Sequence, residues 1–202
     1  MDWEVIGMRV IERLPLETER LSLRRYTLAD VPAIYRINSS EEVTRYLPFG
    51  PMMSEEDARS QLERFFLPAY AQADAGQTGP DGLPLDLKFA ACLKDTEELV
   101  GMVFVETSDG SCELGYTVDS RWWGRGIATE MCQTVVDLAR TLGLARLTAT
   151  VDVRNVASEC VLAHVGMKPR RPAEGTWQGG EVDGCRMWEL ELLPSGGTAS
   201  GP

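Results

Sequence analysis

Cationic residues are scarce in this sequence. Of its 202 residues, 20 are Lys or Arg and 31 are Asp or Glu, which gives a net charge of −11. A general nucleic-acid-binding surface needs clustered cations to neutralise phosphates, so this balance predicts no nucleic-acid partner. The surplus of carboxylates favours a cationic partner such as an amine or a basic peptide. A polyanionic ligand would require a local site of cations or backbone N–H groups that works against the overall field.

Closely spaced cysteines and long apolar runs are also absent. The five cysteines stand at positions 92, 112, 132, 160 and 185, and no pair has the spacing of a metal knuckle or a redox dithiol. We therefore expect no metal site, and cysteines that pack in the core of a protein from a reducing compartment. No apolar run approaches the ~18 residues of a membrane span, and the first residues lack the basic segment of a signal peptide. These absences predict a cytoplasmic protein without a membrane partner.

The length is that of one domain. We expect an N-terminal extension over residues 1–13 and a folded domain over 14–193. The Gly- and Ser-rich tail at 194–202 cannot bury apolar surface and is predicted to be disordered.

Apolar periodicity predicts a mixed α/β (α+β) domain. Helices are predicted at 28–38, 58–73, 127–142 and 156–165, and strands at 20–26, 87–93, 99–105, 113–118, 147–153 and 185–192. Thr27 is expected to cap the first of these helices and Asn155 the last, whereas Pro68 is expected to kink or break the helix at 58–73.

The segment from Arg121 to Glu130 carries the clearest chemical signal. It lies between a predicted strand and a long predicted helix, and reads Arg-Trp-Trp-Gly-Arg-Gly-Ile-Ala-Thr-Glu. Gly124 and Gly126 would let the backbone approach a ligand closely. The free N–H groups of the first helical turn would then face an anion, and Arg121 and Arg125 would add local cations. The segment is neither a P-loop nor a dinucleotide fingerprint, and its alternative interpretation is a plain tight turn.

Arg121-x-x-Gly124-x-Gly126 resembles the Arg/Gln-x-x-Gly-x-Gly/Ala motif of the GCN5-related N-acetyltransferases (GNAT). Further matches resemble the branch of the ribosomal-protein alanine and serine N-acetyltransferases (RimJ/RimL-like). They are residues 19–24 (ERLSLR), 123–130 (WGRGIATE) and 155–158 (NVAS), the last shortly before Gly166-Met167.

This resemblance implies a mixed, mostly antiparallel sheet flanked by helices and splayed between the strands at 112–118 and 147–153. It implies acetyl-CoA as co-substrate, with the pantetheine arm along Tyr116, Thr117 and Val118. The implied pyrophosphate site comprises Gly124, Arg125, Gly126, Ile127, Ala128 and Thr129, with Arg121 as a further cation and Trp123 as a wall.

The commonest general acid of the wider family, a Tyr four residues before the Gly that follows the second helix, is replaced here by Leu162. The resemblance points instead to Ser158, whose hydroxyl would donate to the departing sulfur, and to Asn155 as a ligand of the pantetheine amide. Both residues could equally be ordinary first-turn helix residues.

Two carboxylates are candidates for the general base. Glu113 shares a strand face with Gly115 and Thr117 beside the expected splay, whereas Glu174 lies where the related branch carries a loop carboxylate. A general base is not strictly required if the acceptor is an N-terminal amine, because a pKa of about 8 leaves an appreciable fraction of that amine unprotonated.

The sequence thus predicts an enzyme that acetylates a primary amine, with a protein or peptide N-terminus as the leading acceptor. A small-molecule amine acetyltransferase and a non-catalytic acyl-CoA-binding module are the alternatives. The length of the acyl group and the choice between monomer and homodimer stay open.

Overall fold

The computed structural model describes residues 14–77, 86–108, 111–172, 176–177, 180–181 and 184–192. The predicted extension and tail, and the candidate base Glu174, lie outside these residues. None of the helices described is long and apolar enough to cross a membrane.

One eight-stranded sheet organises the chain, in the order β1-β2-β3-β4-β5-β6-β10-β7. Neighbouring strands are antiparallel except β5 and β6, which are parallel, so the predicted mixed and mostly antiparallel sheet is confirmed. The strands are β1 (Leu16–Glu17), β2 (Leu21–Arg24), β3 (Leu87–Leu93), β4 (Leu99–Ser108), β5 (Ser111–Val118), β6 (Arg146–Asp152), β7 (Lys168–Pro172) and β10 (Cys185–Glu191), with β8 (Thr176–Trp177) and β9 (Gly180–Glu181) as a separate pair.

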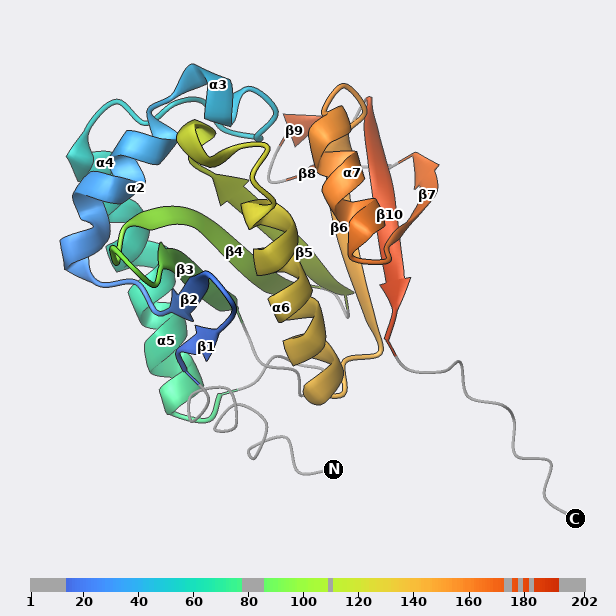
Figure 1. Ribbon diagram of the computed structural model, residues 1–202, viewed down its shortest axis with the longest axis horizontal. Coiled ribbons are helices and arrows are strands. Elements are labelled where there is room, and N and C mark those ends of the chain that lie inside the picture. Colours follow the sequence, from blue (N-terminus) through green and yellow to red (C-terminus); the bar gives the residue numbers. More distant parts are fainter. Residues whose placement is uncertain are drawn as a thin grey trace, which may run out of the picture.

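Helices cover both faces of the sheet (Figure 1). On one face lie η1 (Leu28–Asp30), α2 (Val31–Asn38), α4 (Glu55–Gln61), the π-helical turn η2 (Leu62–Phe66) and α5 (Leu67–Asp74), with α3 (Glu41–Thr44) at their edge. On the other face lie α6 (Ile127–Thr141), preceded by η3 (Ser120–Trp122), and α7 (Val156–His164). Each layer has its own core: Met131 and Val135 of α6 pack with Val103 and Leu114 of the sheet, whereas Ile34, Leu62 and Phe66 fill the opposite side.

The chain stays helical through Pro68, where a kink or break was expected. The α4 helix ends at Gln61, the π-helical turn η2 follows directly, and Pro68 lies in the first turn of α5, so the irregularity precedes the proline. Phe65, within η2, is 62% exposed.

The predicted splay begins at Glu113. The only partners that β5 and β6 share within the described chain are Glu113 and Thr148, after which the strands diverge. Figure 1 shows β6, β10 and α7 set apart from the strands that α6 covers. The edge of β5 from Leu114 to Val118 therefore faces the gap with no strand on that side.

Candidate active site

A continuous cavity of about 1290 Å³ runs through the splay. Its donor end is formed by β5, the turn before α6 and the start of α7, and includes Tyr116, Thr117, Val118, Trp122, Trp123, Gly124, Gly126, Ile127, Ala128, Thr129, Asn155 and Ser158. The other end, which we call the acceptor end, is formed by α3 and the loop after it, the end of α4, η2, α5 and the sheet beneath them, and includes Glu42, Arg45, Tyr46, Phe49, Gln61, Arg64, Phe65, Asp86, Lys88, Phe104 and Glu106.

Two glycines shape the turn at the donor end. Gly124 and Gly126 have φ values of +70° and +77°, a left-handed conformation that residues with a Cβ rarely adopt. Gly126 is the N-cap of α6, and Glu130 is the first residue in that helix whose N–H bonds back to it. The N–H groups of Ile127, Ala128 and Thr129 have no acceptor within the helix. They line the cavity at the positive end of the helix dipole, which suits an anion.

The two arginines of the motif are engaged elsewhere. The Arg121 guanidinium binds Glu98 Oε1 at 2.5 Å and Asp119 Oδ2 at 2.7 Å, and that of Arg125 lies 4.8 Å from the centre of the Trp122 ring. Within the described residues, neither arginine lines the cavity. Their contact with a pyrophosphate stays a prediction. Within the turn, the backbone N–H groups are the hydrogen-bond donors that face the cavity.

A clamp from the N-terminal strands supports this turn. Arg20 donates from Nη1 to the Arg125 carbonyl at 2.8 Å and from Nε to Glu130 Oε2 at 2.7 Å. Thr18 also donates to Glu130. Burial alone would raise the pKa of Glu130, but the hydrogen bonds from Thr18 and Arg20 outweigh it and hold that pKa below its usual value. Two separate stretches of the family-like sequence thus form one structural unit.

Glu130→Gln is therefore expected to weaken acetyl-CoA binding by about three- to tenfold, because it loosens the turn without touching the cavity. Calorimetric titration with acetyl-CoA measures the effect. Asp137→Asn, which breaks the exposed Asp137–Arg140 pair on the same helix, serves as the control and should leave affinity unchanged. Equal affinity in both variants would show that the clamp does not support the binding turn.

Trp123 closes the free edge of β5. Its Nε1 donates to the Val118 carbonyl at 2.8 Å, so the indole marks the end of the stretch available for pairing with a ligand. The ring is 45% exposed and lines the cavity, in accord with its predicted position as a wall.

The start of α7 brings Asn155 and Ser158 to the opposite side of the donor end. Asn155 Oδ1 accepts from the Ser158 N–H at 3.1 Å, so Asn155 is the expected N-cap. Across the splay, the Tyr116 hydroxyl lies 2.7 Å from Ser158 Oγ and 3.2 Å from the Ser158 carbonyl oxygen. Leu162, where the wider family has its tyrosine, is fully buried in the core.

Glu113 lies where the strands part, between the two ends of the cavity. Its Oε1 accepts from the Thr150 N–H at 3.1 Å and so satisfies a backbone donor that the divergence of β6 would otherwise leave unpaired. Burial raises the pKa of this carboxyl, and the bond from Thr150 lowers it by less. A carboxylate with a raised pKa beside a cavity is suited to accepting a proton.

A buried lysine lies beneath the acceptor end. Lys88 is 4% exposed, and its Nζ bonds Glu106 Oε1 at 2.5 Å and lies 5.5 Å and 5.3 Å from the ring centres of Phe66 and Phe104. Phe104 can lie flat on the sheet only because Gly115 faces it, since a Cβ there would come within 2.1 Å of the ring. These rings and the lysine fix one wall of the acceptor end.

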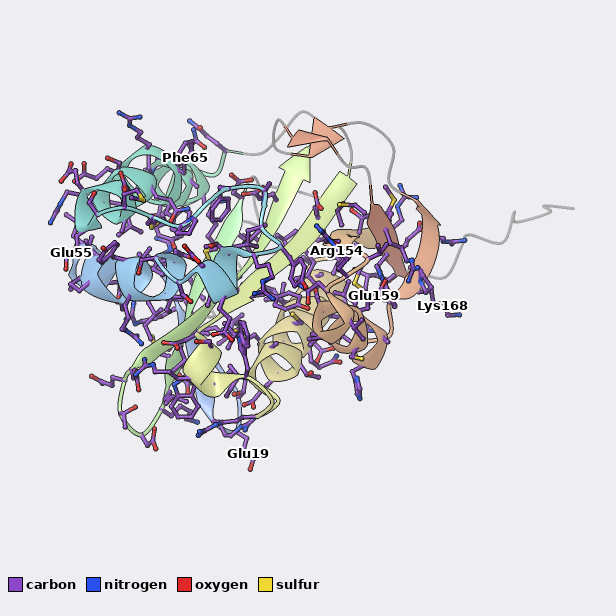
Figure 2. The ribbon with its side chains drawn as sticks, turned by 90° about the horizontal axis from the view of Figure 1, so that it is seen from above. Glu19, Glu55, Phe65, Arg154, Glu159 and Lys168 are labelled. Atoms are coloured by element: carbon purple, nitrogen blue, oxygen red, sulfur yellow. The ribbon has the colours of Figure 1, made fainter. Side chains whose placement is uncertain are left out.

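Two cavity-lining residues, Arg154 and Tyr46, come from elements far apart in the sequence and contact each other. The Arg154 guanidinium, which follows β6, lies 5.8 Å from the ring of Tyr46, which follows α3. Figure 2 shows Arg154 pointing toward the helical layer.

Several of these contacts, and the buried Lys88, could not be identified from sequence. The partners Arg20 and Glu130 are 110 positions apart, and Tyr116 and Ser158 are 42 apart, so only the tertiary fold brings them together. Tyr116 alternates with Leu114 and Val118 on a core-facing strand, which gives its hydroxyl no visible role. For Lys88, a charge within an apolar strand was the one available signal.

Comparison with known proteins agrees with this geometry. Residues 20–168 match the family model described as an acetyltransferase (GNAT) domain. The uncharacterized N-acetyltransferase YoaA of Bacillus subtilis is 32% identical over 157 residues, which cover 76% of this chain and 82% of that protein. The structure of Mycobacterium smegmatis RimJ in complex with CoA-disulfide superposes with a TM-score of 0.65 at 26% identity, covering 85% of this chain and 81% of that one. Spermidine N-acetyltransferase from Vibrio cholerae, in complex with CoA and spermine, has the same fold, with a TM-score of 0.67 at 16% identity over 87% and 97% of the two chains.

Proposed function

Because the chain belongs to the GNAT family and is an N-acetyltransferase, we propose that it transfers the acetyl group of acetyl-CoA to the α-amine of a protein or peptide by direct attack. The observation that carries the proposal is the single cavity that joins an anion-binding helix start to an ionisable carboxylate, Glu113.

Each half of the reaction has a place in this cavity. The N–H groups at the start of α6 would hold the pyrophosphate, and the free edge of β5 would pair with the pantetheine arm. The amine would enter from the acceptor end and attack the thioester carbon, while Glu113 takes its proton through a water. Ser158, on the other side, would donate to the departing sulfur. No covalent enzyme intermediate is needed.

The charges at the acceptor end are mixed. Its cations, Arg45, Arg64 and Lys88, are accompanied by the carboxylates Glu42, Asp86, Glu106 and Glu113, and Lys88 is paired with Glu106 and Asp86, so charge alone does not separate a peptide amine from a polyamine. Gln61 also lines the cavity, and its Oε1 is buried without a hydrogen-bond partner in the described structure. A turn of this side chain would offer the oxygen to a peptide N–H or a single ammonium group.

Release of free CoA in the presence of candidate amines tests this assignment. Peptides that begin with Ala or Ser should be acetylated with a kcat/KM at least tenfold above that for spermidine or an aminoglycoside. A higher kcat/KM for either small amine would replace the peptide by a small-molecule acceptor. Binding of acetyl-CoA with no turnover of any amine would favour a non-catalytic binding module.

A further inference from the structure

The Tyr116 hydroxyl has an unusual position for a strand residue in a core. It reaches from β5, across the splay, to the first turn of α7, where it meets both the side chain and the backbone of Ser158. Both residues line the donor end of the cavity. The α7 side of the donor end has Leu162 where the wider family has a tyrosine. The phenol of Tyr116, from β5 across the splay, lies on that side instead.

The two hydroxyls have two hydrogen-bonding arrangements. In the first, Tyr116 donates to the Ser158 carbonyl oxygen at 3.2 Å, and the Ser158 hydroxyl donates its proton to the Tyr116 oxygen. In the second, Tyr116 donates to Ser158 Oγ at 2.7 Å, and the serine proton is free to point into the cavity. A negative charge in the cavity next to Ser158 selects the second arrangement, in which each hydroxyl polarises the next.

We propose that Tyr116 and Ser158 act as one two-hydroxyl donor that stabilises the thiolate leaving from acetyl-CoA, with Tyr116 as the positioning residue that frees and polarises the serine proton. This inference rests on the proposed function, since it needs the thioester sulfur at the donor end. The C–N bond forms as the amine attacks, the C–S bond breaks, and the sulfur leaves with the electron pair. The amine proton passes through Glu113 to solvent, and solvent later protonates the thiolate.

Both hydroxyls keep their protons throughout this step. Burial raises the pKa of Tyr116 well above its ordinary value, which makes the phenol a poor source of a whole proton but leaves it a good hydrogen-bond donor. Ser158 also lies in the first turn of α7, where the helix dipole favours a nearby negative charge. The contribution is therefore electrostatic, and it is largest when the sulfur is most negative.

The thiol of bound CoA reports this effect without any acceptor amine. Its ionisation can be followed by thiolate absorbance, as the difference between complexes with CoA and with desulfo-CoA under reducing conditions, so that protein thiols and phenols cancel. A free thiol titrates near 8.5. We expect the wild-type protein to lower the pKa of the bound thiol by about two units, Tyr116→Phe to restore about one of them, and Ser158→Ala to restore both.

Non-additivity separates this role from a structural one. If Tyr116 acts through Ser158, the double variant should match Ser158→Ala, and Ser158→Thr, which keeps a hydroxyl, should stay near wild type. Tyr35→Phe, at a partly buried tyrosine of α2 that does not line the cavity, is the matched control and should change nothing. Desulfo-CoA affinity should be within about threefold of wild type in every variant, which verifies the fold.

Failure of the inference and failure of the proposed function give different results. An unshifted thiol pKa in wild type, an unchanged one in Tyr116→Phe, or additive effects in the double variant would overturn the two-hydroxyl donor even if peptides are acetylated. Absence of CoA binding by the wild-type protein would instead remove the proposed function and with it the premise.

Discussion

Gly126→Val is expected to reduce affinity for acetyl-CoA by about 100-fold or more. Gly126 caps α6 at a φ of +77°, which a β-branched residue does not tolerate, so the turn must rearrange. An added Cβ would meet only the Arg20 guanidinium, at an ordinary contact distance of 3.4 Å, so the strain lies in the backbone. Loss of two or more N–H bonds to a charged phosphate, at roughly 1.5–3 kcal/mol each, accounts for this magnitude.

The opposite end of the same helix provides the control. Gly143 follows α6 with a φ of +76°, and an added Cβ there meets nothing within 4 Å. Gly143→Val therefore imposes a similar backbone strain away from the cavity. It should lower the melting temperature as Gly126→Val does but leave the calorimetric Kd for acetyl-CoA unchanged. Similar Kd values for the two variants would show that the turn before α6 is not the anion site.

Glu113→Gln is expected to lower kcat by roughly 100-fold, the lower range for loss of a general base. The amide oxygen of glutamine can still accept from the Thr150 N–H, so the junction of β5 and β6 is kept. Because burial raises the pKa of Glu113, the acid limb of the pH–kcat profile should lie above pH 4.5 in wild type, and it should vanish in the variant. Glu42→Gln, at an exposed carboxylate that lines the acceptor end, is the control and should keep the limb.

The same substitution should make the protein more stable at neutral pH. A carboxyl whose pKa is higher in the folded than in the unfolded state binds its proton more tightly when folded, so the free energy of unfolding falls as pH rises through that interval. Glutamine mimics the protonated form and escapes this loss. The melting temperature of Glu113→Gln should exceed that of wild type at pH 7, and the difference should shrink below pH 4.5. A lower melting temperature with normal kcat would assign Glu113 a purely structural role.

The fold was largely predictable because its signals are local. The caps at Thr27 and Asn155 appear in the sequence next to the helices they begin, and the structure confirms those helices. The short β1, β8 and β9 and the single-turn α3 escaped prediction, because elements of two to four residues show no periodicity. The β7 strand escaped it because Pro169 and Pro172 argue against a strand, and β7 lies at the edge of the sheet, where proline is tolerated.

The site was predictable only where a motif is contiguous. Gly124 to Thr129 form one turn, so spacing alone places them together. Whether an arginine in that turn faces a ligand or a carboxylate depends on residues far along the chain, and Arg121 pairs with Glu98. The contact between Tyr116 and Ser158 likewise exists only because the sheet splays and α7 packs beside the gap. Pairings of this kind are set by tertiary packing, which no local pattern encodes.

The most direct test of the proposed activity is the mass of the product formed from isotopically labelled acetyl-CoA. Two peptides should be compared, one beginning with a free Ser or Ala and carrying an internal Lys, and the same peptide with its N-terminus blocked. We predict a single labelled acetyl group on the α-amine of the free peptide and none on the blocked one. Labelling of the internal Lys in both, or of neither peptide while a small amine in the same panel is labelled, would contradict transfer to a peptide N-terminus.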